Sequence, residues 1–425
     1  MTRIIIIGGG FAGLKLAEVL NNTSYHVLLI DKVNHHQFQP LFYQVATAGL
    51  EPSSISFPFR WIFHHSKNVR IRYAEVQQVV SAENKIKTDI GEFNYDHLVL
   101  ATGATTNFFG NKNLETWSYP MKSTSEAINL RQHVLQNFEE ALVASEAKKE
   151  ALMNFVIVGG GPTGVELSGA FAEMRRHVFP NDYPELDFSK MKIIMVESSP
   201  KTLGNMSEKS SSKSRQYLEE LGVQVMTNTQ VKDYDGSKVL LGDGSSIPSN
   251  TVVWTAGIKG NLIEGINKEI VVRGNRLKVD RFSRIEGYAN IYAIGDIANM
   301  VTDKYPNGHP QVANVALGQA KVLGKNFKNI LSNKPLIQYE YHDKGSMATV
   351  GKHKAVADLP LVSFQGFFAW FIWMALHLVL LMGMKNKIFV FIDWVIGYFS
   401  NDSTLRLIFT PHAKQNQKMV NVHNS

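Results

Sequence analysis

The sequence predicts an α/β fold with two similar parallel-sheet domains and a C-terminal, membrane-associated helical segment. Two glycine-rich loops, at residues 8–13 and 159–164, each follow a short apolar run that is typical of a strand covered on both faces. The residues after the first loop have the spacing of a packed helix. Near the C-terminus, residues 359–384 contain no Asp, Glu, Lys or Arg. These observations place two strand–loop–helix units before an apolar terminal region.

Both loops, GGGFAG and GGGPTG, fit the pattern G-x-G-x-x-G. The first glycine makes a tight turn, the second lets the backbone approach a pyrophosphate, and the third lets helix and strand pack closely. The helix that follows offers unpaired N–H groups to the phosphates. We therefore expect two Rossmann-like dinucleotide-binding domains, an arrangement that suits hydride transfer between a nicotinamide and a flavin. The glycines concerned are Gly8, Gly10, Gly13, Gly159, Gly161 and Gly164.

An acidic residue closes the first unit. Residues 25–30 read as the next strand, and Asp31 follows it, 18 residues past Gly13. A carboxylate at this distance can accept hydrogen bonds from the ribose hydroxyls of an adenosine. The alternative is an ordinary glycine turn with a solvated Asp31.

The second unit has a longer interval. Residues 192–196 read as a strand, and Glu197 follows it, 33 residues past Gly164. The excess falls in residues 177–191, which read as a surface insertion after the helix. Glu197 would bind an unphosphorylated ribose and repel a 2′-phosphate, which favours NADH over NADPH. Lys201 lies nearby in the sequence, and its positive charge would weaken the repulsion of the 2′-phosphate.

Later segments complete the first unit. Residues 96–103 read as a strand ending in a turn, and residues 290–294 as another strand, which runs into Gly295 and Asp296. Asp296 can bind a ribityl hydroxyl or a pyrophosphate-bound water, although a lone Asp here is more often a plain turn residue. Residues 310–325 read as a helix with Pro310 near its first turn.

Composition bounds the function. The chain has 425 residues, a net charge of +7 and no cysteine. It therefore has no disulfide, no thiolate metal site and no thiol with which to reduce disulfides. The basic charge suits an anionic membrane surface. The chain has no tight Lys/Arg block, so we expect no nucleic acid partner. It has no cluster of metal ligands, so we expect no metal. It has no signal peptide, so we expect a cytoplasmic core.

Long strings then resemble a known family, the type II NADH dehydrogenases, which are non-proton-pumping NADH:quinone oxidoreductases among the two-dinucleotide-binding-domain flavoproteins. The strings are HQFQPLFYQVA at 36–46, LATGATTNFFG at 100–110, GVEL at 164–167, WTAG at 254–257 and AIGD at 293–296. The resemblance covers nearly the whole chain. It implies a bound FAD, oxidation of NADH, a membrane quinone as acceptor and a homodimer.

The resemblance also implies roles at matching positions. Glu166 would lie by the nicotinamide, where it orients that ring or relays a proton; the alternative is a carboxylate stabilised by the helix dipole alone. The FAD residues would be Gly8, Gly10, Phe11, Ala12, Gly13, Asp31, Lys32, Ala101, Thr102, Gly103, Asp296 and Ala313. The NADH residues would be Gly159, Gly161, Pro162, Thr163, Gly164, Glu197, Ala256 and Gly257.

One segment departs from the family. Quinone-reducing members usually carry Ala-Gln-x-Ala-x-Gln under the flavin, whereas this chain has Asn314 and Gly318 at the two glutamine positions. Asn314 keeps a shorter amide, and Gly318 has no side chain. Gln319 is one position off and would face about 100° away on a helix. We take Asn314 and Gly318 as candidate quinone contacts that this replacement alters.

The apolar C-terminal region contains a run at 364–382, long enough to consider for a membrane-spanning helix, and a second stretch at 388–399 with one apolar helical face. Lys385, Lys387 and Arg406 flank the second stretch. We favour monotopic attachment to the bilayer surface; the alternative is that these helices cover the core or form a dimer. His377 is a candidate proton donor to the quinone, although such a residue is more often structural.

The expected organisation is an FAD domain at 1–120 and 285–345, an NADH domain at 121–284, membrane-anchoring helices at 346–410 and a polar tail at 411–425. The expected function is transfer of a hydride from NADH to FAD and of two electrons to a membrane quinone, at the cytoplasmic face of the plasma membrane. The alternatives are a flavin reductase with a non-quinone acceptor and a flavoprotein redox sensor or scaffold.

Overall fold

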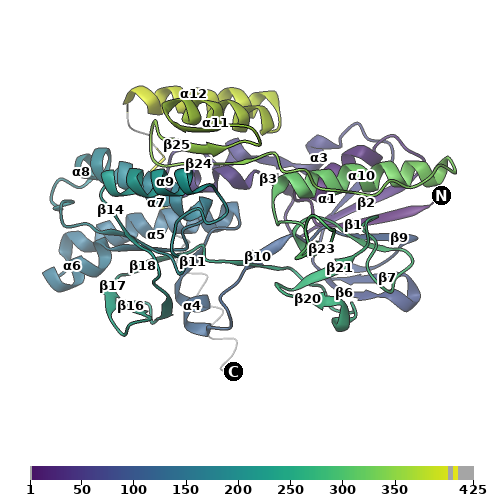
Figure 1. The fold of residues 1–425 in the computed structure, drawn as a ribbon, viewed down its shortest axis with the longest axis horizontal. Coiled ribbons are helices and arrows are strands. Elements are labelled where there is room, and N and C mark those ends of the chain that lie inside the picture. The colour runs from purple at the N-terminus through teal and green to yellow at the C-terminus, as the bar shows by residue number, and fades with distance from the viewer. Residues whose placement is uncertain (1, 401–404, 410–425) are drawn as a thin grey trace.

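The computed structural model describes residues 2–400 and 405–409, and it forms two α/β lobes joined by a pair of strands (Figure 1). The predicted tail at 411–425 and the end of the predicted anchor, residues 401–404 and 410, lie outside the described residues. Each lobe is built on a five-stranded parallel sheet, as the two glycine loops predict.

The first lobe centres on the order β22-β9-β1-β2-β5. Its strands are short, and all but the edge strand β5 are almost fully buried, because helices α1 and α10 cover the sheet and pack against each other. The main elements are β1 (Arg3–Ile7), α1 (Phe11–Leu20), β2 (His26–Asp31), β5 (Val69–Tyr73), β9 (His97–Leu100), β22 (Ile291–Ala293) and α10 (Ala313–Leu331). The smaller elements are β3 (His35–Gln37), β4 (Ser56–Pro58), α3 (Phe59–Ile62), β6 (Val76–Val80), β7 (Lys85–Thr88), β8 (Gly91–Asn94), β20 (Val271–Val272), β21 (Arg276–Val279) and β23 (Ala298–Met300). Helix α2 (Phe42–Ala46) follows β3 in the chain but packs against helices of the second lobe.

The second lobe centres on the order β11-β18-β12-β13-β14. Its elements are α4 (Lys112–Trp117), β11 (Tyr119–Pro120), α5 (Thr124–Val143), α6 (Glu146–Met153), β12 (Phe155–Val158), α7 (Pro162–His177), α8 (Phe179–Asp182), β13 (Ile193–Val196), α9 (Glu208–Glu220), β14 (Val223–Met226), β15 (Val231–Tyr234), β16 (Lys238–Leu241), β17 (Ser246–Pro248) and β18 (Thr251–Trp254). The antiparallel pair β10 (Ala104–Thr106) and β19 (Ile258–Gly260) joins the lobes. After β19 the chain returns to the first lobe, where β21 pairs with β23. The domain limits at 120, 284 and 345 stay predictions.

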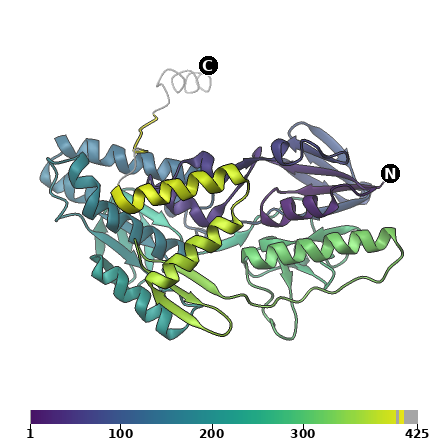
Figure 2. The ribbon, with the colours of Figure 1, turned by 90° about the horizontal axis from the view of Figure 1, so that it is seen from above.

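The C-terminal region is a sheet with two helices lying side by side above it (Figures 1 and 2). The sheet consists of β24 (Ser346–Thr349), β25 (Ala355–Asp358) and β26 (Ser363–Gly366), and the helices are α11 (Phe367–Leu380) and α12 (Met384–Ser400). The sequence did not predict this sheet. Within the described residues, no helix combines the length and the apolar character that crossing a membrane requires.

Two local predictions in the second lobe need correction. Much of the segment 177–191 is exposed, as expected of a surface insertion, but part of it packs into the core: Phe179 and Phe188 are buried, with ring centroids 4.6 and 5.4 Å from that of Phe138. The charged residues 148–150 suggest a turn from the sequence, but they belong to α6. This helix is rich in good helix formers and begins after Ser145 at the cap position.

In the first lobe, the helix expected at 310–325 begins three residues later, at Ala313. Its cap residue Val312 is extended, and the amide of His309 donates to the carbonyl of Met300, so this stretch is held in a loop. Pro310 therefore lies before the helix rather than in its first turn.

Candidate active site

A cavity of about 670 Å³, the first cavity, lies where the amino ends of α1 and α10 meet the carboxyl ends of β1, β2 and β9. Gly8 has φ +100°, and a Cβ there would collide with the carbonyl of Ala101. A Cβ on Gly13 would collide with the carbonyl of Gly8, so Gly13 packs helix against strand and does not line the cavity. The predicted residues that line it are Gly8, Gly10, Phe11, Ala12, Asp31, Lys32, Ala101, Thr102, Gly103, Glu166, Asp296, Ala313 and His377.

Two half-buried carboxylates, those of Asp31 and Asp296, border this cavity. Asp31 accepts hydrogen bonds from the amides of Gly9, at 2.5 Å, and Val33, at 2.8 Å. Burial raises the pKa of Asp31, and these hydrogen bonds oppose the rise. Burial also raises the pKa of Asp296, against the nearby charges of Lys122 and Arg276. The glycine loop, in which a Cβ at Gly8 or Gly13 would collide with backbone, lies here with two helix amino ends, a carboxylate at the end of β2 and a carboxylate in the turn after β22. This combination fits an adenine dinucleotide that carries a flavin.

A second cavity, of about 480 Å³, lies at the other glycine loop. Gly159 has φ +110°, and a Cβ there would come within 2.8 Å of the amide of Ala256. Glu197 accepts hydrogen bonds from the amide of Gly160 at 2.5 Å and from the amide and hydroxyl of Ser199 at 2.7 and 2.6 Å. Burial raises the pKa of Glu197, but the hydrogen bonds outweigh burial and the pKa lies below its ordinary value. Glu197 is thus an ionised acceptor, suited to ribose hydroxyls.

The two cavities adjoin, because Lys122, Pro162, Thr163, Gln311 and Val312 line both. Ligands in them would therefore meet. The predicted residues that line the second cavity are Gly161, Pro162, Thr163, Glu197 and Gly257. Those that shape the loop from behind are Gly159, Gly164 and Ala256.

Glu166 separates the first cavity from a third cavity, of about 220 Å³, which lies between the second lobe and helices α11 and α12. Its carboxylate faces the amide of Thr349 at 3.4 Å and lies beside the indole N–H of Trp373. Burial raises the pKa of Glu166 to about 8, so at neutral pH the side chain is mostly protonated. A protonated carboxyl at this wall can donate a hydrogen bond or a proton.

His377 reaches the first cavity from α11. Its Nδ1 lies 2.8 Å from the carbonyl oxygen of Trp373, and its ring stacks on the Trp373 ring with centroids 3.9 Å apart. A carbonyl only accepts, so Nδ1 carries the hydrogen and Nε2 is the acceptor. Burial lowers the pKa of His377 to about 4, so the ring is neutral at neutral pH.

Asn314 and Gly318 line neither the first nor the second cavity. A Cβ on Gly318 would come within 2.5 Å of the Tyr339 hydroxyl oxygen and 2.8 Å of its ring, so the space beside Gly318 is filled by Tyr339. The neighbouring Gln319 is buried, and its Oε1 accepts the amide of Gly295 at 2.7 Å. Gln319 therefore orders the turn before Asp296.

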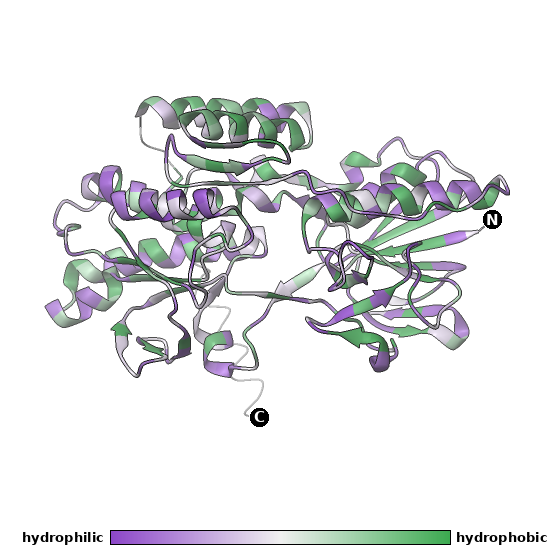
Figure 3. Cartoon of the chain, in the orientation of Figure 1, coloured by the Kyte–Doolittle hydropathy of each residue, from purple (hydrophilic) through white to green (hydrophobic). Residues whose placement is uncertain are grey.

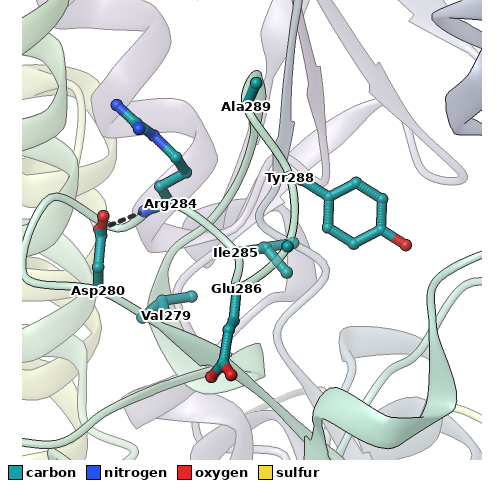
Figure 4. Close-up of a pocket in the computed structure, with 8 residues that line it drawn as sticks. Val279, Asp280, Arg284, Ile285, Glu286, Tyr288 and Ala289 are labelled. Carbon is teal, nitrogen blue, oxygen red and sulfur yellow. Dashed lines mark hydrogen bonds between the residues drawn. The ribbon is translucent and has the colours of Figure 1, made fainter.

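Sequence reasoning missed several residues of the site. Lys122 and Gln311 line both cavities, and Gln311 donates to the carbonyl of Asp296 at 2.9 Å. His36 is buried, with Nδ1 3.1 Å from the carbonyl of Gly9. Of these, only His36 lies in one of the quoted strings. A further hollow, of about 480 Å³, is formed by the single stretch from Val279 to Ala289 and contains none of the predicted site residues (Figure 4).

Two adjoining dinucleotide cavities, each on its own glycine loop, define a flavoprotein that oxidises a nicotinamide nucleotide. Residues 2–320 match the pyridine nucleotide-disulphide oxidoreductase family, and residues 343–401 match the NDH2 C-terminal domain. The chain is 32% identical to the type II NADH:quinone oxidoreductase Ndh of Mycobacterium tuberculosis, over 94% of this chain and 88% of that protein. It is 30% identical to the type II NADH:quinone oxidoreductase of Staphylococcus saprophyticus, over 83% and 89% respectively. The chain therefore belongs to the type II NADH:quinone oxidoreductase family, with FAD and NADH as its cofactors.

Solved structures share the fold. That of NDH2 from Plasmodium falciparum in complex with NADH has a TM-score of 0.88 at 23% identity and covers 96% of this chain and all of the other, 100%. The sulfide:quinone oxidoreductase of Aquifex aeolicus has a TM-score of 0.70 at 19% identity, covering 97% of this chain and 96% of that one. Despite the name of the matched disulphide oxidoreductase family, this chain has no cysteine, so disulfide chemistry is excluded.

Proposed function

We propose that this chain transfers two electrons from NADH to a membrane quinone through FAD, without pumping protons. The observation that carries the proposal is the adjacency of the three cavities, with Glu166 at the wall between the first and the third. The overall reaction converts NADH, a proton and a quinone into NAD⁺ and a quinol. The protein supplies distance, orientation and electrostatics.

The first cavity would hold FAD, which when bound supplies the hydride-accepting and electron-donating ring. The loop at 8–13 would receive the pyrophosphate, Asp31 the adenosine ribose, and Asp296 the ribityl or pyrophosphate end. Lys32, Thr102, Gly103 and Ala313 would complete the wall. Support comes from the collisions that a Cβ would make at Gly8 and Gly13 and from the placement of both carboxylates.

The second cavity would receive NADH. The loop at 159–164 would hold its pyrophosphate, and the ionised Glu197 its adenosine ribose. Because Glu197 lines the second cavity and carries a negative charge, it would repel a 2′-phosphate and select NADH over NADPH. Pro162, Thr163 and Gly257 would line the path toward the first cavity.

In this proposal, Glu166 and His377 are the residues that contact the quinone. Glu166, protonated at neutral pH, donates a proton to the quinone oxygen. His377, with Nδ1–H committed to the carbonyl of Trp373, keeps Nε2 as an acceptor rather than serving as the proton donor. Asn314 and Gly318 do not line the first cavity, so its lining gives no support to contacts between these two residues and the quinone. The ring of Tyr339 fills the space beside Gly318.

We also propose peripheral attachment to the bilayer, at the cytoplasmic face of the plasma membrane. The apolar face of α12 points outward: Phe391 is 51% exposed and Phe399 is 80% exposed, while α11 adds Phe371 at 58%. The hydropathy colouring shows both helices predominantly hydrophobic (Figure 3). Lys385 and Lys387 at the start of α12 suit anionic headgroups. A homodimer stays a prediction from the family resemblance.

The test of this function is NADH oxidation by the purified holoenzyme in detergent, first with a short-chain quinone and then with ferricyanide. We expect turnover with both acceptors, with one quinol formed for each NADH. Turnover with ferricyanide but none with quinone above the protein-free control would contradict the quinone assignment.

A further inference from the structure

Helix α7 carries a line of residues that leads from Glu166 toward the surface. Glu166, Ala170, Glu173 and His177 are spaced by four, three and four residues, which places them on one helix face. They cover about 16 Å along the helix axis. Exposure rises along the line: Glu166 is buried, the Glu173 side chain is 22% exposed and the His177 side chain is 41% exposed.

Cavities accompany this line. The third cavity is lined by Glu166, Ala170 and Glu173, and an adjoining hollow of about 150 Å³ is lined by Glu173 and His177. The small side chain of Ala170 leaves space between the two carboxyl groups. A water molecule needs roughly 10–15 Å³ of such volume and two to four polar partners, so both spaces can hold water.

The contacts along the line are polar. One Glu173 oxygen accepts the amide of Lys352 at 3.0 Å, and the other lies 3.5 Å from Nε2 of His177. The Lys352 ammonium donates to the carbonyls of Gly397 and Tyr398, which holds the end of α12 over these spaces. The titratable and charged groups that face the line include Tyr43 on α2, Lys352 and His353 after β24, Asp393 and Tyr398 on α12, and Arg406. Glu51 interacts with Asp393.

The reaction requires a proton to enter. NADH brings two electrons and one proton, whereas a quinol carries two electrons and two protons. One proton per turnover must therefore come from water. Because Glu166 is buried, a donor role at that position needs a path for its own reprotonation.

The geometry points to a proton route along α7, in which His177 and Glu173 pass a proton from water to Glu166 through the hollow and the third cavity. The inference rests on the proposed function. The O–H bond of the Glu166 carboxyl breaks as the quinone oxygen gains that proton, and the Glu166 carboxylate is then reprotonated from Glu173 through water. Glu173 regains its proton from His177 or solvent, and no side chain is oxidised or reduced.

The test compares Glu173→Gln with wild type. Glutamine keeps a carbonyl oxygen for the Lys352 amide but cannot carry a proton. We expect the kcat with quinone to fall about tenfold at pH 8.5 and less at pH 6, where protons are abundant. Turnover with ferricyanide should not change, because that reaction releases a proton and takes up none. Glu173→Asp should recover most of the loss.

The matched control is Glu18→Gln on α1, where the carboxylate has 31% exposure and pairs with Lys15 at 2.8 Å. It should leave both activities at the wild-type level. A wild-type pH profile for Glu173→Gln with quinone would overturn the route. Absence of quinone turnover in the wild type would instead contradict the proposed function.

A readout independent of turnover is the infrared band of the protonated Glu166 carboxyl, assigned by its loss in Glu166→Gln. On transfer of the holoenzyme to D₂O, this band should shift at least several-fold more slowly in Glu173→Gln than in wild type or Glu18→Gln. Equal rates in all three proteins would show that Glu166 exchanges protons by another path and would overturn the inference.

Discussion

The raised pKa of Glu166 makes the stability of the protein depend on pH in a defined direction. Burial raises its pKa to about 8 in the folded chain, from an ordinary value of 4.5. Between these values the unfolded chain releases the proton and the folded chain keeps it. The contribution of Glu166 to stability is therefore complete below about pH 4.5 and is lost as the pH rises to about 8.

The substitution Glu166→Gln should remove this dependence. Relative to the variant, the wild type should lose free energy of unfolding as pH rises from 5 to 8, at up to about 1.4 kcal/mol per pH unit. Urea unfolding at several pH values measures the difference, with Glu18→Gln as the control. Parallel curves for wild type and Glu166→Gln would show that Glu166 is ionised in the folded protein.

Gly318 gives a second residue-scale prediction. Because its missing side chain makes room for the ring of Tyr339, Gly318→Ala should destabilise the protein by about 1–3 kcal/mol. The matched control is Leu317→Ala on the same helix, which leaves Gly318 and the room for the ring of Tyr339 unchanged. Thermal or urea unfolding checks the result. A neutral Gly318→Ala, with wild-type quinone turnover, would mean that the ring of Tyr339 moves aside freely.

At the scale of elements, α11 and α12 are apolar on the side that faces away from the body, and polar contacts hold them from beneath. The indole N–H of Trp394 donates to Gln44 at 2.8 Å, and Asn386 donates to the carbonyls of Ser53 and Ser54. Val390 and Trp373 are buried against the body. The helices are thus fixed in place, while residues of their outer face such as Phe371 and Phe399 stay exposed among the residues that the structure describes, as expected of an interfacial anchor.

Charges placed on that face should weaken bilayer binding without unfolding the protein. We expect the double variant Phe371→Asp, Phe399→Asp to bind anionic liposomes at least tenfold more weakly than wild type in a sedimentation assay. The control is Val143→Asp, which changes an 87% exposed apolar residue at the end of α5. Undiminished binding by the double variant would contradict attachment through α11 and α12.

The elements also show where sequence reasoning succeeds. The strands before both glycine loops are continuous apolar runs, and such runs fix a buried parallel strand with little reference to the rest of the fold. In contrast, the charged residues 148–150 suggest a turn but lie inside α6. The segment 177–191 was expected to be a surface insertion because of its prolines and polar residues, which give no sign of the aromatic contacts that Phe179 and Phe188 make with Phe138.

Across the whole molecule, the dinucleotide cavities could be predicted because each depends on local signals, a glycine loop and an acidic residue after the next strand. The acceptor side could not, because it is assembled from distant segments. Glu166 lies against Thr349 and Trp373, more than 180 positions away, and no local pattern joins them. For the same reason, the sequence of the helix alone does not show that the ring of Tyr339 fills the space beside Gly318.

The central claim is that electrons leave this protein directly to a quinone. Anaerobic stopped-flow mixing tests it most directly: the holoenzyme is first reduced with one equivalent of NADH, then mixed with a short-chain quinone while flavin absorbance is followed. We expect full recovery of the oxidised flavin spectrum, with one quinol formed per flavin. A flavin that stays reduced with quinone yet is oxidised at once by ferricyanide would contradict it.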